Sequence, residues 1–269
     1  MDLLIIILLG IVEGVTEFLP VSSTGHLILA GRLFGLAEAD ATFDIVIQLG
    51  AILAIVVLYW RRFWAVGRGL LARDAGAVRF TRNVLIGFLP SAVVGALAYG
   101  AIRAVLEAPT IAPVVVSVAL IVGGFLILGI ERVARHPWMH DVEAITWRMA
   151  LGIGVVQCLS MIPGVSRSAS TIMGALTLGV DRETAAEYSF FLAIPTMVGA
   201  TTLALYKSRD TLGDAQLTAI GIGFVVSFLV ALVVVRWFIG VVSRHGFAPF
   251  AWYRIAAGSL ALLLLALHG

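Results

Sequence analysis

The chain has 269 residues and a formal net charge of +2, and it is 61% hydrophobic but only 13% charged. A soluble domain carries about 25% charged residues, so this composition excludes an ordinary soluble protein and indicates a polytopic membrane protein. The single cysteine, Cys158, excludes an internal disulfide, and the sequence has no Cys/His cluster for zinc. The arginines lie between apolar segments, so nothing indicates binding to nucleic acid.

The first apolar region, residues 3–35, carries ionisable side chains where a membrane helix is expected. Glu13 and Glu17 are four residues apart and therefore lie on one face of that helix. Pro20 ends the helix, because proline lacks an N–H donor and clashes with the preceding turn. An ionisable group at membrane depth costs at least ~2.5 kcal/mol, so these carboxylates indicate a functional site.

Polar residues also follow the break at Pro20. Ser22 and Ser23 stand at the N-cap of an expected second helix, and His26 lies three or four residues into it. Ser22 could serve only as a cap. The open N–H groups at such a helix start can bind an anion, so we expect carboxylates, hydroxyls and an imidazole to converge on an anion site.

Six later apolar runs are long enough to cross a membrane as helices. A second broken region, residues 148–180, is interrupted at Pro163. Each half of the two broken regions is too short to cross comfortably, so we expect two re-entrant helical hairpins whose breaks line a cavity. The expected fold is therefore all-α. The six expected spans are 42–60, 84–104, 111–130, 186–206, 216–236 and 249–267.

The break at Pro163 contains one cation, Arg167, among hydroxyl residues. Gly164 permits a sharp backbone turn before it. A guanidinium group among hydroxyls at a helix start suits phosphate oxygens. The expected phosphate-binding residues of the two breaks are Ser22, Ser166, Arg167, Ser168 and Thr171.

Several motifs occur twice, in the same order, in the two halves of the chain. Each half holds one hairpin and three crossings, and an odd number of crossings inverts the second copy. We therefore expect a single membrane domain, 1–269, with inverted repeats at 1–132 and 145–269 and a site at their interface. The matching motifs are Gly10-Ile-Val-Glu13 with Gly154-Val-Val-Gln157, Gly87-Phe88 and Ser91 with Gly223-Phe224 and Ser227, and Ala112-Pro113 with Ala248-Pro249.

The basic residues between the spans predict the orientation in the membrane. Twelve lie on one side and four on the other, and the richer side is expected to be cytoplasmic. Both termini would then face outward. Arg254 lies inside the last expected span, and we expect its side chain to extend to the membrane interface.

Two motifs, Glu13-Gly-Val-Thr-Glu17-Phe-Leu-Pro-Val-Ser-Ser-Thr-Gly-His26 and Pro163-Gly-Val-Ser-Arg-Ser-Ala-Ser-Thr171, resemble the signature motifs of the bacterial undecaprenyl-diphosphate phosphatases of the bacitracin-resistance type. The resemblance extends over nearly the whole chain. It implies a multi-pass enzyme of the bacterial cytoplasmic (inner) membrane that hydrolyses undecaprenyl diphosphate to undecaprenyl phosphate and inorganic phosphate, in recycling of the cell-wall lipid carrier. The functional positions it implies are Glu13, Glu17, Ser23, His26, Ser166, Arg167 and Thr171.

The resemblance also implies a divalent cation, Mg²⁺ or Ca²⁺, for which Glu13 and Glu17 are the expected ligands. Arg167 would hold the terminal phosphate. Ser23 would attack phosphorus with His26 as base, or His26 would attack directly. The active site is expected to open to the outer face. The expected partners are the polyprenyl diphosphate substrate and membrane lipids, and a homodimer is compatible with the sequence.

Two other functions compete with this interpretation. Inverted repeats with broken helices also describe transporters, so a transporter or flippase of a polyprenyl phosphate lipid is the alternative. The other large family of membrane lipid phosphatases shares pieces of these motifs, but it needs a further histidine several residues after its Ser-Arg pair. Ile172, Met173 and Gly174 occupy that region here, so this rival fails.

The orientation can be tested with single cysteines in a Cys158→Ser background. Loops 61–82 and 131–147 are expected to face the cytoplasm, and loops 105–110 and 207–215 the outside. In intact cells, an impermeant maleimide should therefore label Gly213→Cys and spare Ala75→Cys. The opposite labelling pattern would show that the orientation is wrong.

Overall fold

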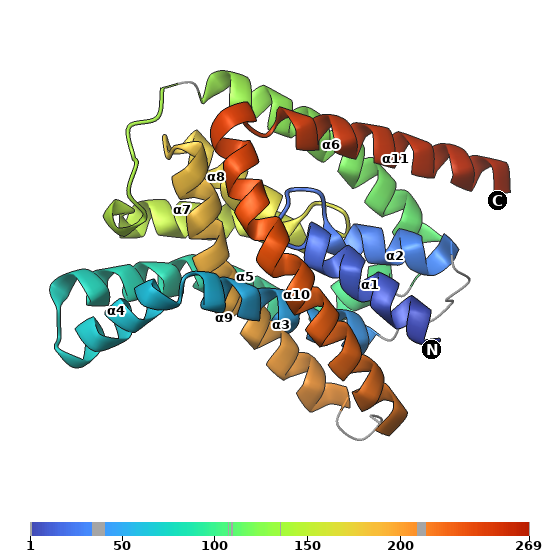
Figure 1. The fold of residues 1–269 in the computed structure, drawn as a ribbon. Helices are drawn as coiled ribbons and strands as arrows, with labels where there is room; N and C mark the ends of the chain where they lie inside the picture. The colour runs from blue at the N-terminus through green and yellow to red at the C-terminus, as the bar shows by residue number, and fades with distance from the viewer. Residues whose placement is uncertain are drawn as a thin grey trace.

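The computed structural model describes residues 2–33, 41–106, 108, 110–134, 136–208 and 214–268, and within these ranges the chain is helical and forms no β-strand. The helices cross in a single body with the breaks near its middle (Figure 1). The α-helices are α1 Leu3–Thr16, α2 Ser23–Leu33, α3 Ala41–Leu58, α4 Trp60–Leu71, α5 Ala75–Leu106, α6 Ile111–Val133, α7 Trp147–Gln157, α8 Arg167–Thr177, α9 Arg182–Ser208, α10 Asp214–His245 and α11 Ala248–His268, with 3-10 turns η1 Val142–Ala144 and η2 Cys158–Met161.

Among the described residues, five helices are long and apolar enough to cross a membrane by themselves: α5, α6, α9, α10 and α11. They confirm five of the six predicted spans. The remaining span, predicted at 42–60, corresponds to α3, which passes the same test only together with α4. The two helices are bent by 77° at Tyr59, so α4 leaves the direction of the span.

Two of the spanning helices are longer than predicted. α5 begins at Ala75 instead of residue 84, and α10 ends at His245 instead of residue 236. The added turns carry apolar side chains that the fold buries, Phe80 in α5 and Phe238 in α10. The prediction stopped at arginines, whereas burial of the neighbouring side chains extends both helices past them.

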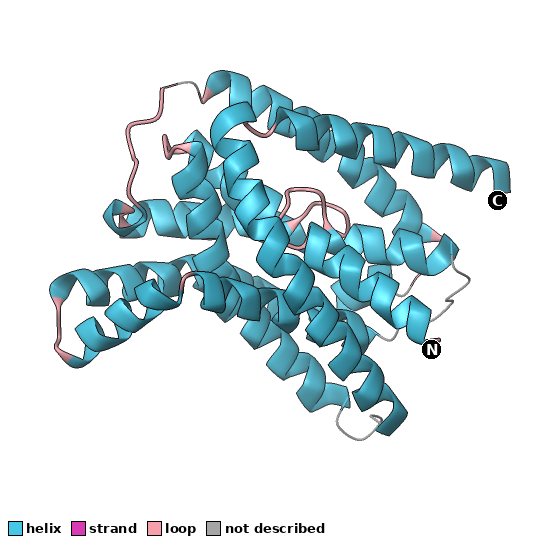
Figure 2. Cartoon of the chain, in the orientation of Figure 1, coloured by secondary structure: helices cyan, strands magenta, loops and turns pink. Residues whose placement is uncertain are grey.

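Both predicted breaks are present. The chain leaves α1 at Thr16 and starts α2 at Ser23, and it leaves η2 at Met161 and starts α8 at Arg167. α1 packs against α2 and α7 against α8, as hairpins do. The breaks themselves meet, because the Ser168 hydroxyl donates to the Leu19 carbonyl at 2.7 Å. Figure 2 shows the two loops side by side among the helices.

The packing between the two halves is reciprocal at the matched glycines. A Cβ atom on Gly10 would meet the Gly223 carbonyl oxygen at 3.0 Å, and one on Gly154 would overlap the Gly87 carbonyl. Gly10 matches Gly154 in the repeat, and Gly87 matches Gly223. Each hairpin therefore packs closely on the other half, α1 on α10 and α7 on α5, as an inverted repeat would require. The repeat limits and the direction in the membrane stay predictions.

An aromatic cluster anchors the first break. Phe18, next to Glu17 in the chain, is fully buried, and its ring meets that of Phe190 edge to face at 5.2 Å. Phe190 in turn contacts Tyr59 and Phe238. Such pairs add about 0.5–1.5 kcal/mol each beyond the area they bury. The cluster therefore fixes the backbone next to Glu17.

Candidate functional site

The helices that follow the two breaks begin in the same unusual way. Ser22 and Ser166, the residues just before α2 and α8, have positive φ angles of 73° and 78°. Non-glycine residues pay about 1–3 kcal/mol for such a conformation, which persists where a site demands it. Each hydroxyl accepts a hydrogen bond from the backbone N–H three residues on, Gly25 at 3.3 Å and Ala169 at 3.1 Å. Ser22 thus caps α2, and its predicted contact with phosphate stays a prediction.

Glu17 joins the two breaks. The Ser23 hydroxyl donates to its Oε2 at 2.6 Å, and the Arg167 Nη2 donates to its Oε1 at 2.9 Å. All three residues are buried. One carboxylate thus holds a hydroxyl from the first break and a guanidinium group from the second, although the two breaks lie about half the chain apart.

Arg167 is held in one orientation by further contacts. Its Nη1 donates to the Ser189 carbonyl at 2.9 Å and lies 3.3 Å from the Ser189 hydroxyl. Its carbon centre lies 5.7 Å from the centroid of the Phe18 ring. Its Nε is buried and has no acceptor among the described residues. A fixed guanidinium group with a donor to spare is suited to an anionic oxygen of a ligand.

The other hydroxyls predicted to bind phosphate are already engaged. Ser166 caps α8, and its hydroxyl lies 3.0 Å from that of Ser168, which donates to the first break. Thr171 Oγ1 lies 2.7 Å from the Ser189 hydroxyl and donates to the Arg167 carbonyl at 3.0 Å. These hydroxyls order the second break around Arg167.

Glu13 is completely buried, and neither carboxylate oxygen has a hydrogen-bond partner in the described part of the chain. Its repeat counterpart Gln157 donates to the Ser91 hydroxyl at 2.6 Å. An uncompensated buried carboxylate is costly, so these oxygens suit a proton or a cation. Mg²⁺ is commonly bound by one or two carboxylates together with water and phosphate oxygens, so Glu13 beside Glu17 fits it. The described residues contain no group of three His, Cys, Asp or Glu side chains placed for a metal.

His26 is fixed at both ring nitrogens. Nδ1 lies 2.7 Å from the Ser22 carbonyl, which can only accept, so Nδ1 carries the proton. In the neutral ring Nε2 then accepts from the Tyr253 hydroxyl at 2.7 Å, and the two rings stack with centroids 5.6 Å apart. The group that contacts the Ser23 hydroxyl is therefore the Glu17 carboxylate and not the His26 ring.

Sequence reasoning missed three residues that the structure places around this site: Ser189, Tyr253 and Arg254. Ser189 is one of several hydroxyl residues in an apolar span, which is a weak signal. The expectation that Arg254 extends to the membrane interface is wrong, because its side chain is fully buried. The signal for Arg254 was present, since a charge several residues inside a span needs a partner in the protein.

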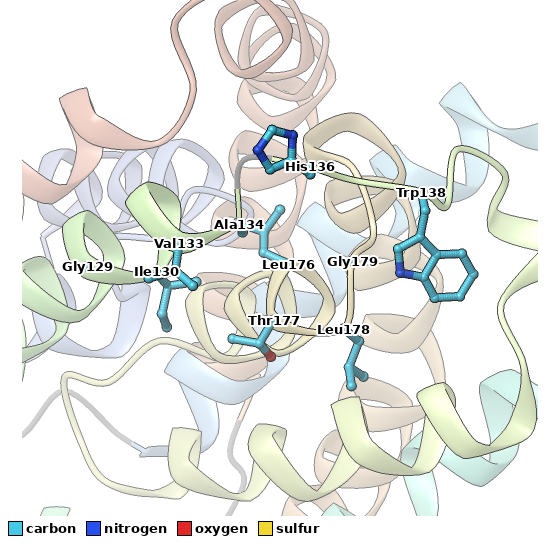
Figure 3. A pocket seen from close by; sticks show the side chains of 10 residues that line it. All are labelled: Gly129, Ile130, Val133, Ala134, His136, Trp138, Leu176, Thr177, Leu178 and Gly179. Atoms are coloured by element: carbon cyan, nitrogen blue, oxygen red, sulfur yellow. The ribbon is translucent and has the colours of Figure 1, made fainter.

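A cavity of about 520 Å³ lies elsewhere, where the ends of α6 and α8 meet the loop after α6 (Figure 3). None of the predicted site residues lines it. Its lining residues are Gly129, Ile130, Val133, Ala134, His136, Trp138, Leu176, Thr177, Leu178 and Gly179.

Comparison with known proteins decides the family. Residues 6–260 match the family model described as "Bacitracin resistance protein BacA". The chain belongs to this family. Within it, the chain is 70% identical to the undecaprenyl-diphosphatase of Rhizorhabdus wittichii, over 98% of both chains. It is 60% identical to that of Sphingopyxis alaskensis, again over 98% of both, and 57% identical to that of Novosphingobium aromaticivorans, over 97% of both.

The buried ion pair of Glu17 and Arg167 predicts how substitutions at these two positions change the stability of this BacA-family protein. Arg167→Met leaves a buried carboxylate unpaired and should lower the free energy of unfolding by about 3–5 kcal/mol. The double variant Glu17→Gln/Arg167→Met should recover most of that loss. Thermal unfolding in detergent, followed by tryptophan fluorescence, measures both. If the two single losses simply add in the double variant, the residues do not form a pair.

Proposed function

We propose that this protein hydrolyses undecaprenyl diphosphate to undecaprenyl phosphate and inorganic phosphate. The observation that carries the proposal is the chain of contacts from Ser23 through Glu17 to Arg167, which offers a nucleophile, a base and an anion-binding group in one buried place. The names of the BacA-family relatives supply the substrate. Hydrolysis of this lipid would recycle a cell-wall carrier and underlie bacitracin resistance.

Ser23 acts as the nucleophile, with Glu17 as its base. The proton of the Ser23 hydroxyl passes to Glu17 Oε2, and Ser23 Oγ forms a bond to the terminal phosphorus. The bond between that phosphorus and the bridging oxygen breaks, and undecaprenyl phosphate leaves. Water then attacks the phosphorus of the phosphoserine, the bond between phosphorus and Ser23 Oγ breaks, and inorganic phosphate leaves. Ser23 Oγ takes back the proton held by Glu17, and the proton lost by the water is released with the phosphate. The 2.6 Å contact between Ser23 and Glu17 supports this assignment.

Arg167 binds the terminal phosphate. Its unpaired Nε donor supports this role, as does the planar guanidinium group, which can bind two phosphate oxygens together. A phosphate bound to Arg167 also competes with the Glu17 carboxylate for the Arg167 guanidinium group. Glu17 then loses part of its ion pair and takes the Ser23 proton more readily, so substrate binding itself prepares the base.

Glu13 and Glu17 are the residues that would hold a divalent cation, Mg²⁺ or Ca²⁺. When bound, such an ion offsets the negative charge of the diphosphate. The unpartnered oxygens of Glu13 support this role. Direct attack by His26 is a second candidate, but Nε2 would first have to release the Tyr253 hydroxyl.

The protein is a multi-pass membrane protein, and we place it in the bacterial cytoplasmic membrane with the site opening outward. The distribution of basic residues supports this direction. The isoprenyl tail would leave sideways between the spans into lipid. A homodimer is compatible with this mechanism, which needs one chain only.

Purified protein in detergent tests the proposal through phosphate release from undecaprenyl diphosphate. Wild type should release phosphate, and a chelator should stop the release. Glu17→Gln should lose at least ~10²-fold in kcat because it removes the base. Glu183→Gln, an exposed carboxylate in the first turn of α9, is the matched control and should keep wild-type turnover.

Two outcomes would contradict the proposal. Near-normal turnover of Glu17→Gln at saturating Mg²⁺ would remove Glu17 from the chemistry. Wild-type protein that releases no phosphate, but moves a polyprenyl phosphate across proteoliposome membranes, would favour the transporter.

A further inference from the structure

Arg254 on α11 is the largest fully buried side chain among the described residues, with 0% of its surface exposed. It is also a charged one. Neither the motifs of the two breaks nor the proposed chemistry gives it a role. Its neighbours on α11 reach the same region, since Tyr253 holds His26.

All five N–H donors of the Arg254 guanidinium group are satisfied by backbone carbonyls. Nη1 donates to Pro20 at 2.9 Å and to Val165 at 3.0 Å. Nη2 donates to Ala119 and Gly164, both at 3.0 Å, and Nε to Leu120 at 3.3 Å. Only arginine carries five donors in a planar fork, so lysine could not replace this set.

These carbonyls come from both breaks. Pro20 lies in the first break, three residues before Ser23, and Gly164 and Val165 lie in the second, directly before Ser166 and Arg167. The remaining two belong to α6, which packs closely along α11. The Arg254 side chain thus connects the two loops to each other and to the packed helices α6 and α11.

The arrangement has no second copy within the repeat. By the match of Ala112-Pro113 with Ala248-Pro249, the position equivalent to Arg254 is Val118. One arginine is sufficient, because the two breaks meet and a single guanidinium group reaches both.

We propose that Arg254 is a positioning residue that sets the distance between the Ser23 hydroxyl and the phosphate held by Arg167. The inference rests on the proposed phosphatase activity. A shift of about 1 Å between reacting groups can slow a reaction by ~10²-fold. Loss of the Arg254 hydrogen bonds should therefore affect the transition state more than substrate binding.

Two variants disrupt the hydrogen bonds of Arg254 in different ways. Arg254→Lys keeps the charge but has three donors for five carbonyls. Gly123→Ala leaves Arg254 intact, but the added Cβ would overlap its Nη2 and displace the guanidinium group. Gly129→Ala, on the same helix α6, meets nothing within 4 Å and is the matched control.

The experiment measures kcat, KM and the inhibition constant of orthovanadate, which mimics the trigonal-bipyramidal transition state, for each purified variant. Arg254→Lys and Gly123→Ala should each lower kcat by ~10²-fold, weaken vanadate inhibition and change KM little. Gly129→Ala should match wild type. The vanadate constant does not depend on the fraction of active enzyme, so a mere loss of folded protein would not move it.

Active wild type with unchanged kcat and vanadate inhibition in both variants would overturn this inference and leave the proposed function standing. Variants that lose activity with an unchanged vanadate constant, or that do not fold, would show that Arg254 serves the fold alone. Wild-type protein without phosphatase activity would instead contradict the proposed function.

Discussion

The carboxylate of Glu17 accepts a hydrogen bond from each half of the molecule, one from the Ser23 hydroxyl and one from the Arg167 guanidinium group. The rest of the structure depends on these two contacts. Ser23 lies 6 residues from Glu17 in the chain, whereas Arg167 lies 150 residues away. A buried carboxylate of this kind is stable only while both donors are in place. The hairpin breaks, the strained residues just before α2 and α8, and the aromatic cluster around Phe18 keep them there.

Much of this fold follows from the sequence because membrane helices obey simple rules of length and hydrophobicity. The two prolines mark the breaks, and five of six spans are confirmed. The bend at Tyr59 and the helix α4 after it were not predicted, because Arg61, Arg62 and Arg68 made this stretch read as a basic loop. The additional turns of α5 and α10, beyond the arginines at which the predicted spans stop, were also missed. Tertiary burial of Phe80 and Phe238 extends these helices, and a local sequence pattern does not show that burial.

The convergence of Glu17, Ser23 and Arg167 was also predictable, from polar residues gathered at the two breaks. Their pairing was not. The family resemblance led us to expect His26 as the base for Ser23 or as the nucleophile itself. The fold instead turns the imidazole to Ser22 and Tyr253 and brings Glu17 to the Ser23 hydroxyl. Contacts from distant helices, such as that of Ser189 with Arg167, depend on how whole elements pack. A pattern within one segment cannot specify them.

The most direct test of this account is to identify the residue that carries phosphate during turnover. Acid-quenched enzyme, mixed for a single turnover with substrate labelled in the terminal phosphate, should contain phosphoserine at Ser23 by peptide mass spectrometry. Ser23→Ala should contain no label. An acid-labile phosphohistidine at His26 that survives in Ser23→Ala would contradict the assignment of Ser23 as nucleophile and of Glu17 as its base.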